Sequence, residues 1–297
     1  MNNKTLVTGG AGFIGSNLVD ALIARGDSVI IIDNLSGGKK ENINPKADFY
    51  EKDLRNYNEI APLFKGIDYV FHLAAQPRVQ VSIERPAETH DNNVNTTLNV
   101  LLAAKETGVK KLIYSASSSA YGDQKEMPLI ETMKTAPMSP YGLQKYIGEE
   151  YARVFSLVYK LKTVSLRYFN VYGPRMSNKG DYANVIGKFL KQKQEGKALT
   201  ITGDGEQTRD FTHVFDVVRA NILASESYKT GNGEIINIGA GSNASVNKIS
   251  KLIGGEIKYI EARLEPHDTL SDNRKAFELL NWKPEISLEK GISDLLK

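Results

Sequence analysis

A tyrosine and a lysine four residues apart are the side chains whose types and spacing most directly suggest chemistry in this 297-residue chain. They are Tyr141 and Lys145, and Ser139-Pro140 before them predicts the N-cap and first residue of a helix. Both side chains then share one helix face. A phenol with a pKa near ~10 is not ionised at neutral pH, but a lysine ammonium beside it favours the phenolate and lowers that pKa. The pair therefore suggests a general base, although this spacing also occurs by chance on ordinary amphipathic helices.

A cluster of serines follows an apolar run that predicts a strand over Lys111 to Ser115. Its members are Ser115, Ser117, Ser118 and Ser119. A serine-rich turn is ordinarily only a polar loop. Ligands collect at the carboxyl edge of a parallel sheet, however, so at this place in the chain we interpret the serines as functional.

Three glycines spaced three apart, Gly9, Gly12 and Gly15, follow the first predicted strand and open the first helix. Their missing side chains allow a tight turn and close approach of the backbone to a pyrophosphate, which the helix N-terminus attracts. Asp33, 18 residues beyond Gly15, ends the second predicted strand. A carboxylate there accepts hydrogen bonds from a ribose diol and repels a 2′-phosphate, which favours NAD over NADP. Asp53 follows the third strand, where an adenine would lie, although a plain turn aspartate would look the same.

The elements that must position these residues alternate between strand-like and helix-like runs. This alternation predicts a Rossmann-type α/β fold, a doubly wound parallel sheet with a smaller C-terminal substrate-binding lobe. We expect residues 1–170 plus about 205–240 to form the NAD-binding domain, and about 171–204 plus 241–297 to form the second lobe. The predicted strands are Thr5 to Val7, Ser28 to Ile32, Ala47 to Tyr50, Tyr69 to Leu73, Lys111 to Ser115 and Thr163 to Tyr168, and the predicted helices are Ser16 to Ala24, Glu59 to Phe64, Asn92 to Glu106 and Tyr141 to Tyr159.

Composition narrows the possible partners. Apolar residues make up 41% of the chain and charged residues 25%, as in globular proteins. The net charge of +3 is too small to indicate nucleic acid or an anionic membrane. Without cysteine there are no disulfides or thiolate metal sites, and the four histidines lack metal-ligand spacing, so we expect no metal. We find neither a signal peptide nor a long apolar span, and expect a cytoplasmic protein.

Together with further motifs, these features give the chain a resemblance to the extended short-chain dehydrogenase/reductase family. Among its members the chain is most similar to the nucleotide-sugar 4-epimerases of the UDP-glucose and UDP-N-acetylglucosamine type. The resemblance runs nearly from end to end. The supporting segments are His72 to Gln76, Asp91 to Asn95, Ser115 to Gly122, Arg167 to Gly173 and Gly203 to Asp210.

The resemblance implies a catalytic triad of Ser117, Tyr141 and Lys145. Tyr141, as the phenolate, would take the proton of the sugar 4-hydroxyl while NAD accepts the hydride from C4. Lys145 would hold the nicotinamide ribose and lower the tyrosine pKa, and Ser117 would hydrogen-bond the same hydroxyl. The resulting 4-keto sugar would rotate about its diphosphate and take the hydride back on its other face, which inverts C4.

The resemblance also implies the residues that hold the two ligands, NAD and a nucleotide-diphosphate sugar, most simply a UDP-sugar. For Arg209 an ion pair with Asp210 or Glu206 is the alternative. The expected NAD contacts are Gly9, Gly12, Phe13, Ile14, Gly15, Asp33, Asn34, Ser36, Gly37, Asp53, Leu54, Leu73, Ala74, Ala75, Gln76, Asn92, Ser115, Tyr141, Lys145 and Phe169. The expected substrate contacts are Ser117, Tyr141, Asn170, Asn184, Arg209, Arg263 and Thr269.

Some positions depart from the family pattern. Thr202 stands where relatives often place an aromatic residue near the nucleotide base, and Gly187 replaces a frequent proline. The segment containing Arg263 is about one residue shorter than usual. Thr269 aligns with the position that gates the sugar pocket, where a small residue leaves room for an N-acetyl group. We therefore expect N-acetylated sugars to be accepted.

Two other functions stay open. A 4,6-dehydratase or a related reductase would use the same fold, but dehydratases carry Asp-Glu where this chain has Ser118-Ser119. A non-catalytic NAD-binding regulator would commonly lose Tyr141 or Lys145. The resemblance further implies a homodimer formed through the predicted helices Asn92 to Glu106 and Tyr141 to Tyr159.

Overall fold

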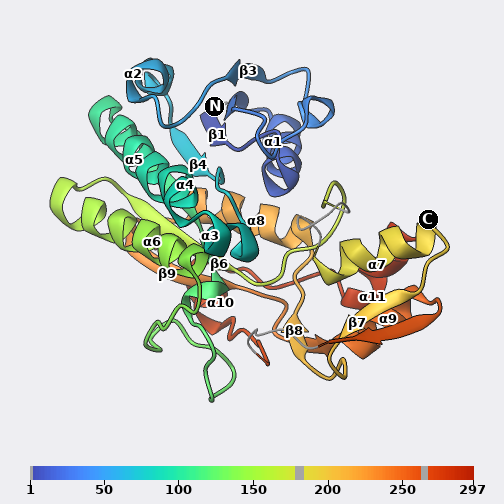
Figure 1. Ribbon diagram of the computed structural model, residues 1–297. Coiled ribbons are helices and arrows are strands. Elements are labelled where there is room, and N and C mark those ends of the chain that lie inside the picture. Colours follow the sequence, from blue (N-terminus) through green and yellow to red (C-terminus); the bar gives the residue numbers. More distant parts are fainter. Residues whose placement is uncertain (1–2, 178–183, 262–266) are drawn as a thin grey trace.

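A seven-stranded, fully parallel sheet forms the centre of the computed structural model, which describes residues 3–177, 184–261 and 267–297 (Figure 1). Its strand order is β3-β2-β1-β4-β5-β6-β9, so the order reverses direction between β1 and β4. The strands are β1 Lys4–Thr8, β2 Ser28–Asp33, β3 Asp48–Glu51, β4 Tyr69–His72, β5 Lys111–Ser117, β6 Thr163–Tyr168 and β9 Asn232–Ile238. The predicted Rossmann-type fold is confirmed, and ligands of such sheets bind where the strand order reverses.

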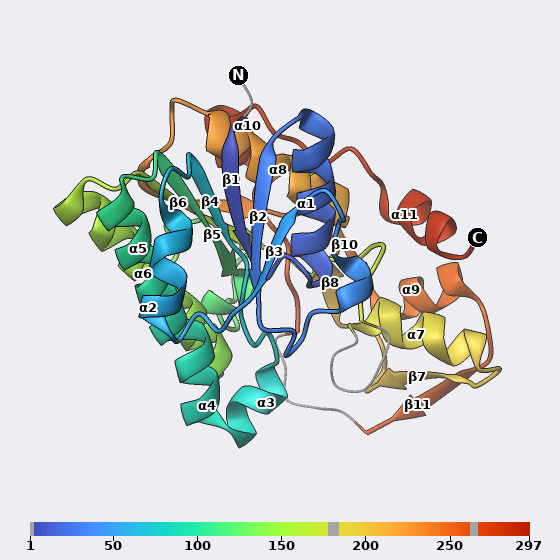
Figure 2. The same ribbon diagram turned by 90° about the horizontal axis from the view of Figure 1, so that it is seen from above.

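Helices cover both faces of this sheet, which explains why its central strands β1, β4, β5 and β6 are buried along most of their length (Figure 2). On one face, α1 Phe13–Arg25, α8 Val214–Glu226 and α10 Arg274–Leu280 enclose a core that includes the fully buried Trp282. On the other face lie α2 Tyr57–Ile60, the 3-10 turn η2 Ala61–Phe64, α5 Thr96–Thr107 and α6 Pro140–Tyr159. The apolar cores on the two faces fix the strands of the sheet, so that the carboxyl ends of the strands keep their positions relative to one another.

Helix α6 begins where the sequence predicts. The Ser139 hydroxyl accepts a hydrogen bond from the amide of Gly142 at 3.1 Å, and Pro140 is the first helical residue. A buried ion pair fastens the helix to β6, since the Glu149 carboxylate accepts from the Arg167 guanidinium at 2.6 and 2.8 Å. This pair fixes the face of α6 that carries Tyr141.

The helix expected from Asn92 to Glu106 differs from the prediction in its first turn. Residues Asp91–Asn95 form a π-helical turn, η3, between α4 Pro86–His90 and α5. The reason lies in Asn93, whose side chain bonds the backbone of Gln76 from both sides: its Oδ1 accepts from the amide at 2.7 Å and its Nδ2 donates to the carbonyl at 3.1 Å. The wider turn accommodates this link, and π-turns are frequent at functional sites.

A smaller lobe is built from two two-stranded sheets and has its own apolar core, which includes Phe189 and Ile249. It contains β7 Leu199–Thr202 beside β11 Ile257–Ile260, β8 Thr208–Asp210 beside β10 Asn243–Ser245, and the helices α7 Val185–Gln194, α9 Val246–Ile253 and α11 Leu288–Leu295. The chain returns to the large sheet in between, as α8 and β9. Residues 274–282 also pack on the large sheet. The domain boundaries given above remain predictions.

Two further findings concern the described part of the chain. None of its helices combines the length and hydrophobicity needed to cross a bilayer. It also holds no group of three His, Cys, Asp or Glu side chains suited to a metal ion.

Candidate active site

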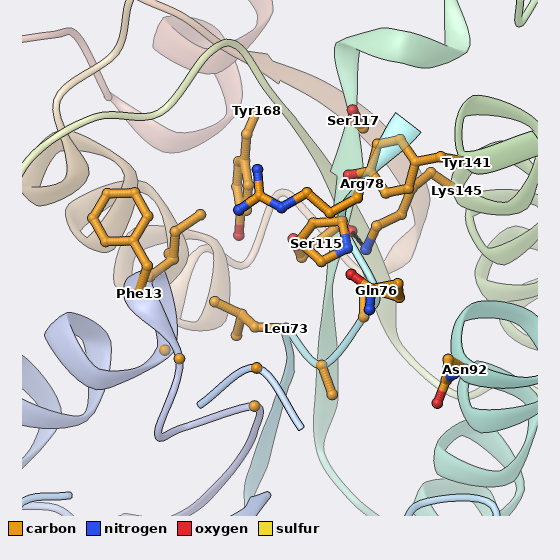
Figure 3. Close-up of a pocket in the computed structure, with 18 of the residues that line it drawn as sticks. Phe13, Leu73, Gln76, Arg78, Asn92, Ser115, Ser117, Tyr141, Lys145 and Tyr168 are labelled. Carbon is orange, nitrogen blue, oxygen red and sulfur yellow. Dashed lines mark hydrogen bonds between the residues drawn. The ribbon is translucent and has the colours of Figure 1, made fainter. Parts of the chain in front are cut away.

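A cavity of about 1470 Å³ opens along the carboxyl ends of the strands and continues to the small lobe (Figure 3). In Figure 3 Phe13 lies on one side, and Ser117, Tyr141 and Lys145 lie on the other. Nearly all residues predicted for the site line this cavity. They are Gly9, Gly12, Phe13, Ile14, Gly15, Asp33, Asn34, Ser36, Gly37, Asp53, Leu54, Leu73, Ala74, Ala75, Gln76, Asn92, Ser115, Ser117, Tyr141, Lys145, Asn170, Asn184, Arg209 and Thr269.

Phe169 is an exception and requires a correction. It is fully buried, packs with Tyr121 and Leu129, and is absent from the cavity lining. Its amide donates to the carbonyl of Ile238 at 3.1 Å, so the backbone donor is also engaged. The neighbours of Phe169 on either side, Tyr168 and Asn170, line the cavity, whereas the Phe169 side chain is turned into the protein core. The other exception, Arg263, lies outside the described residues.

The glycine turn is too tight for side chains. Gly9 has φ +71°, and a Cβ on Gly15 would lie 2.1 Å from the carbonyl oxygen of Gly9. Nearby, Asp33 ends β2, where its carboxylate accepts the amides of Ala11 at 3.0 Å and Leu35 at 2.8 Å. Burial raises the pKa of Asp33, and these two bonds oppose that shift. Each carboxylate oxygen keeps a second lone pair, so the geometry fits a dinucleotide with a free ribose diol.

At the far end of the cavity, Asp53 organises its own turn. Its carboxylate accepts the amide of Arg55 at 2.9 Å and both Nε and a terminal nitrogen of the guanidinium. These bonds lower the pKa of Asp53 to about 2. The sequence left two alternatives for Asp53, a residue of the cofactor site or a plain turn aspartate. In the structure Asp53 lines the cavity and also stabilises its own turn.

Ser117, Tyr141 and Lys145 converge from β5 and α6. Ser117 interacts with the Tyr141 hydroxyl and accepts a hydrogen bond from the Ser119 hydroxyl at 2.7 Å, which leaves its own proton for the tyrosine oxygen. Lys145 donates to the carbonyl of Ser115 at 2.7 Å and lies 5.1 Å from the centre of the Tyr114 ring. The arrangement brings a hydroxyl, a phenol and an amine to one end of the cavity.

The electrostatics of this cluster differ from the expectation. Burial raises the pKa of Tyr141, while its contact with Ser117 and the nearby charge of Arg78 oppose that shift. Burial also lowers the pKa of Lys145 to about 7. Lys145 is desolvated and donates to a backbone carbonyl, and its predicted effect on the tyrosine pKa stays a prediction.

On the small-lobe side, the predicted substrate residues also shape the backbone. The Asn170 amide donates to the carbonyl of Asp210 at 3.0 Å and to the Thr269 hydroxyl at 3.3 Å. Arg209 donates to the carbonyls of Thr208 and His267, both at 2.9 Å, and faces the cavity. The Asp210 carboxylate instead receives backbone amides and the Ser271 hydroxyl.

Asn184 caps helix α7 and explains the unusual glycine that follows it. Its Oδ1 accepts the amide of Gly187 at 2.9 Å, a donor that a proline lacks. A Cβ at Gly187 would also lie 2.6 Å from the carbonyl oxygen of Ser177. Thr202, the other departure, ends β7 and does not line the cavity.

Sequence reasoning missed several lining residues. Arg78 had a usable signal, because it follows the carboxyl end of β4 closely, where a cation is placed to meet an anion or a developing charge. Tyr168 and Val171 lie in the segment Arg167 to Gly173 that supports the resemblance. Among the lining residues without a distinctive motif are Lys39, Asn42, Lys52, Arg55, Pro77, Val79, Gln80, Ile83, Arg175, Met176 and Ser177.

Comparisons with known proteins agree with this geometry. Residues 5–239 match the family model described as NAD dependent epimerase/dehydratase family. A protein of Methanocaldococcus jannaschii with the provisional name UDP-glucose 4-epimerase is 42% identical over 296 residues, 97% of this chain and 95% of that protein. The structure of UDP-glucose 4-epimerase from Thermotoga maritima with UDP-glucose has a TM-score of 0.93 at 43% identity and covers 98% and 96% of the two chains. The structure of UDP-N-acetylglucosamine 4-epimerase from Methanobrevibacter ruminantium, in complex with UDP-N-acetylmuramic acid, has a TM-score of 0.94 at 37% identity. The match covers 100% of this chain and 98% of that chain.

Proposed function

Because this chain belongs to the NAD dependent epimerase/dehydratase family, we propose that it inverts C4 of a UDP-sugar through a transient 4-keto sugar. The resemblance found in the sequence is confirmed, and the chain is an NAD-dependent isomerase of nucleotide sugars. The observation that carries the mechanism is the convergence of Ser117, Tyr141 and Lys145 in the cavity that also contains the glycine turn and Asp33.

The residues of the glycine turn fit NAD. The turn around Gly9 and Gly15 leaves no room for side chains, so backbone amides can meet a pyrophosphate. Asp33 is placed to accept from a ribose diol and would repel a 2′-phosphate. When bound, NAD supplies reversible hydride acceptance.

The chain's own residues move the proton. Tyr141, ionised, takes the proton of the sugar 4-hydroxyl and later returns it. Ser117 interacts with the tyrosine oxygen and is placed to orient the same sugar hydroxyl. Lys145, fixed by its bond to the carbonyl of Ser115, is placed to hold the ribose next to the nicotinamide. Arg209, on the small-lobe side, has a planar guanidinium whose N–H donors are suited to the oxygens of a diphosphate.

A panel of nucleotide sugars tests this proposal. Each sugar is incubated with the purified protein without added NAD, and the epimers are separated. We expect conversion of UDP-glucose or UDP-galactose, with NAD retained because the reaction regenerates it. Product mass distinguishes the alternative, since a 4,6-dehydratase removes water; Ser118 and Ser119, in the 3-10 turn η4 Ser118–Ala120, cannot supply the acid and base that dehydration requires.

Thr269 carries the finer proposal on the sugar. It lines the cavity, and its hydroxyl is engaged with Asn170, so a small, fixed side chain faces this part of the site. When the two substrates are assayed at equal concentration, we expect turnover of UDP-N-acetylglucosamine as well as of UDP-glucose. A complete lack of activity with the N-acetylated sugar would contradict the role given to Thr269. Replacing Thr269 with tyrosine should selectively remove this activity, while UDP-glucose turnover persists.

A further inference from the structure

Asp210 is a fully buried aspartate at the end of β8, directly after Arg209, and it does not itself line the cavity. Strands β8 and β10 lie between the large sheet and the rest of the small lobe (Figure 2). Burying a carboxylate is unfavourable unless hydrogen bonds replace those it makes to water. The partners of Asp210 therefore show which parts of the chain its carboxylate holds together.

The carboxylate of Asp210 ties β8 to two other segments. One of its oxygens, Oδ2, accepts the amide and the hydroxyl of Ser271 at 3.0 and 2.7 Å and the amide of Gly241 at 3.1 Å. The other oxygen, Oδ1, accepts the amide of Ala240 at 2.6 Å. Ala240 and Gly241 closely follow β9, the edge strand of the large sheet, whereas β8 belongs to the small lobe. The Asp210 side chain thus connects the two lobes.

The backbone of Asp210 bonds two of the predicted substrate residues. Its carbonyl accepts the side-chain amide of Asn170 at 3.0 Å, and its own amide donates to the Thr269 hydroxyl at 3.2 Å. Thr269 lies two residues before Ser271, which the Asp210 carboxylate holds. Asn170, Thr269 and Arg209 all line the cavity. A displacement of Asp210 would therefore move all three substrate residues.

The surroundings of this carboxylate are closely packed. A Cβ on Gly239 would lie 2.0 Å from the Ser271 hydroxyl oxygen and 2.8 Å from Oδ2 of Asp210, so a side chain larger than hydrogen does not fit there. The side-chain amide of Asn273 donates to the carbonyl of Gly239 at 2.8 Å, which adds a further hydrogen bond to the same segment. Close packing of this kind leaves the three segments little freedom to move relative to one another.

We propose that Asp210 is a positioning residue for the nucleotide sugar, which keeps Arg209, Asn170 and Thr269 in the arrangement that binds the substrate. This role rests on the proposed function, in which these three residues contact the substrate. Asp210 acts through them, since four donors from the protein already occupy its carboxylate. The proposed base and the glycine turn belong to the large sheet and its helices, so the role concerns substrate affinity rather than proton transfer or NAD retention.

Calorimetric titration of the NAD-loaded protein with UDP tests the proposal. In Asp210→Asn the carboxamide oxygen can keep the three donors of Oδ2, but its NH₂ group then faces the amide of Ala240, a donor against a donor. We expect the affinity for UDP to fall about tenfold and the bound NAD to be unchanged. KM for the UDP-sugar should rise by about the same factor, while kcat changes by less than about threefold. Ser271→Ala removes one of the four hydrogen bonds and keeps the carboxylate, so we expect a smaller loss of UDP affinity.

Asp216→Asn is the matched control for a purely structural effect. Asp216 is also buried, and its carboxylate accepts the amides of Glu285 and Ile286 at 3.0 and 3.1 Å. It lies in α8, and neither of these two partners lines the cavity. Both aspartate variants should unfold at lower urea concentration, but only Asp210→Asn should bind UDP more weakly.

The comparison of UDP affinities decides the role of Asp210. An unchanged affinity in Asp210→Asn, or an equal loss in Asp216→Asn, would overturn the proposal. If Asp210→Asn does not fold, Ser271→Ala takes its place in the same comparison. Because the titration involves no turnover, a protein that binds UDP but epimerises no UDP-sugar would contradict the proposed function alone.

Discussion

Burial acts in opposite directions on the two ionisable side chains at the centre of the site. It raises the pKa of Tyr141 and lowers that of Lys145 to about 7, because desolvation favours the neutral form of each. A base at this place therefore depends on neighbours that oppose desolvation. Ser117 and Arg78 are those neighbours.

Removing the Tyr141 hydroxyl tests the base directly. Tyr141→Phe keeps the ring, so the fold and NAD retention should be unchanged, while turnover falls by about 10³-fold or more because the proton acceptor is lost. Epimer separation and the absorbance of bound NAD measure the two effects. Undiminished turnover would refute the assignment of the base.

Lys145 should leave a signature in the pH dependence of stability. The unfolded chain binds a proton on this side chain up to pH ~10.4, whereas the folded chain releases it near pH 7, so the free energy of unfolding rises with pH in between. Lys145→Met should remove about 2 kcal/mol of the rise between pH 7.5 and 9. Urea unfolding of both proteins at the two pH values measures it. Parallel pH dependences would show that Lys145 stays charged in the folded state.

At the scale of elements, the glycine turn and the cap of α6 followed from sequence, because both are local. Ser139 caps the helix through a residue three positions away. The π-turn at Asp91–Asn95 did not follow, because its cause is a contact between Asn93 and Gln76, which local patterns do not encode. The same holds for the hydrogen bond that the Ser82 hydroxyl accepts from the Tyr141 amide.

Gly15 offers a test of the turn. In Gly15→Ala the added methyl would meet the carbonyl oxygen of Gly9, so the turn between β1 and α1 must open. We expect loss of copurified NAD and a destabilisation of about 1–3 kcal/mol, measured by cofactor absorbance and urea unfolding. Equal NAD content in Gly15→Ala and the unmodified protein would contradict the packing argument.

At the scale of the molecule, α5 and α6 lie side by side on one face of the sheet (Figure 1), and the end of α6 has exposed apolar residues. Leu157, Val158 and Tyr159 are 63%, 58% and 50% exposed. Exposed apolar side chains that gather on one surface favour association, and we retain the prediction of a homodimer through these helices.

A charge on this surface tests the dimer. Leu157→Glu should give a monomer by light scattering, since it places a carboxylate within the proposed apolar contact. Lys258→Glu, at an exposed position on β11 of the small lobe, is the control and should not alter the mass. A monomeric unmodified protein would contradict the prediction.

The sequence alone determined the parallel sheet, the glycine turn, Asp33 and the helix of Tyr141 and Lys145, because periodicity, caps and turns depend on neighbours in the chain. Only the tertiary structure decided that Phe169 is turned away from the cavity and that Lys145 is desolvated. These properties depend on burial and on charges from segments far apart in sequence. Folding brings β4, β5 and α6 together, and the ionisation of Tyr141 is set where they meet.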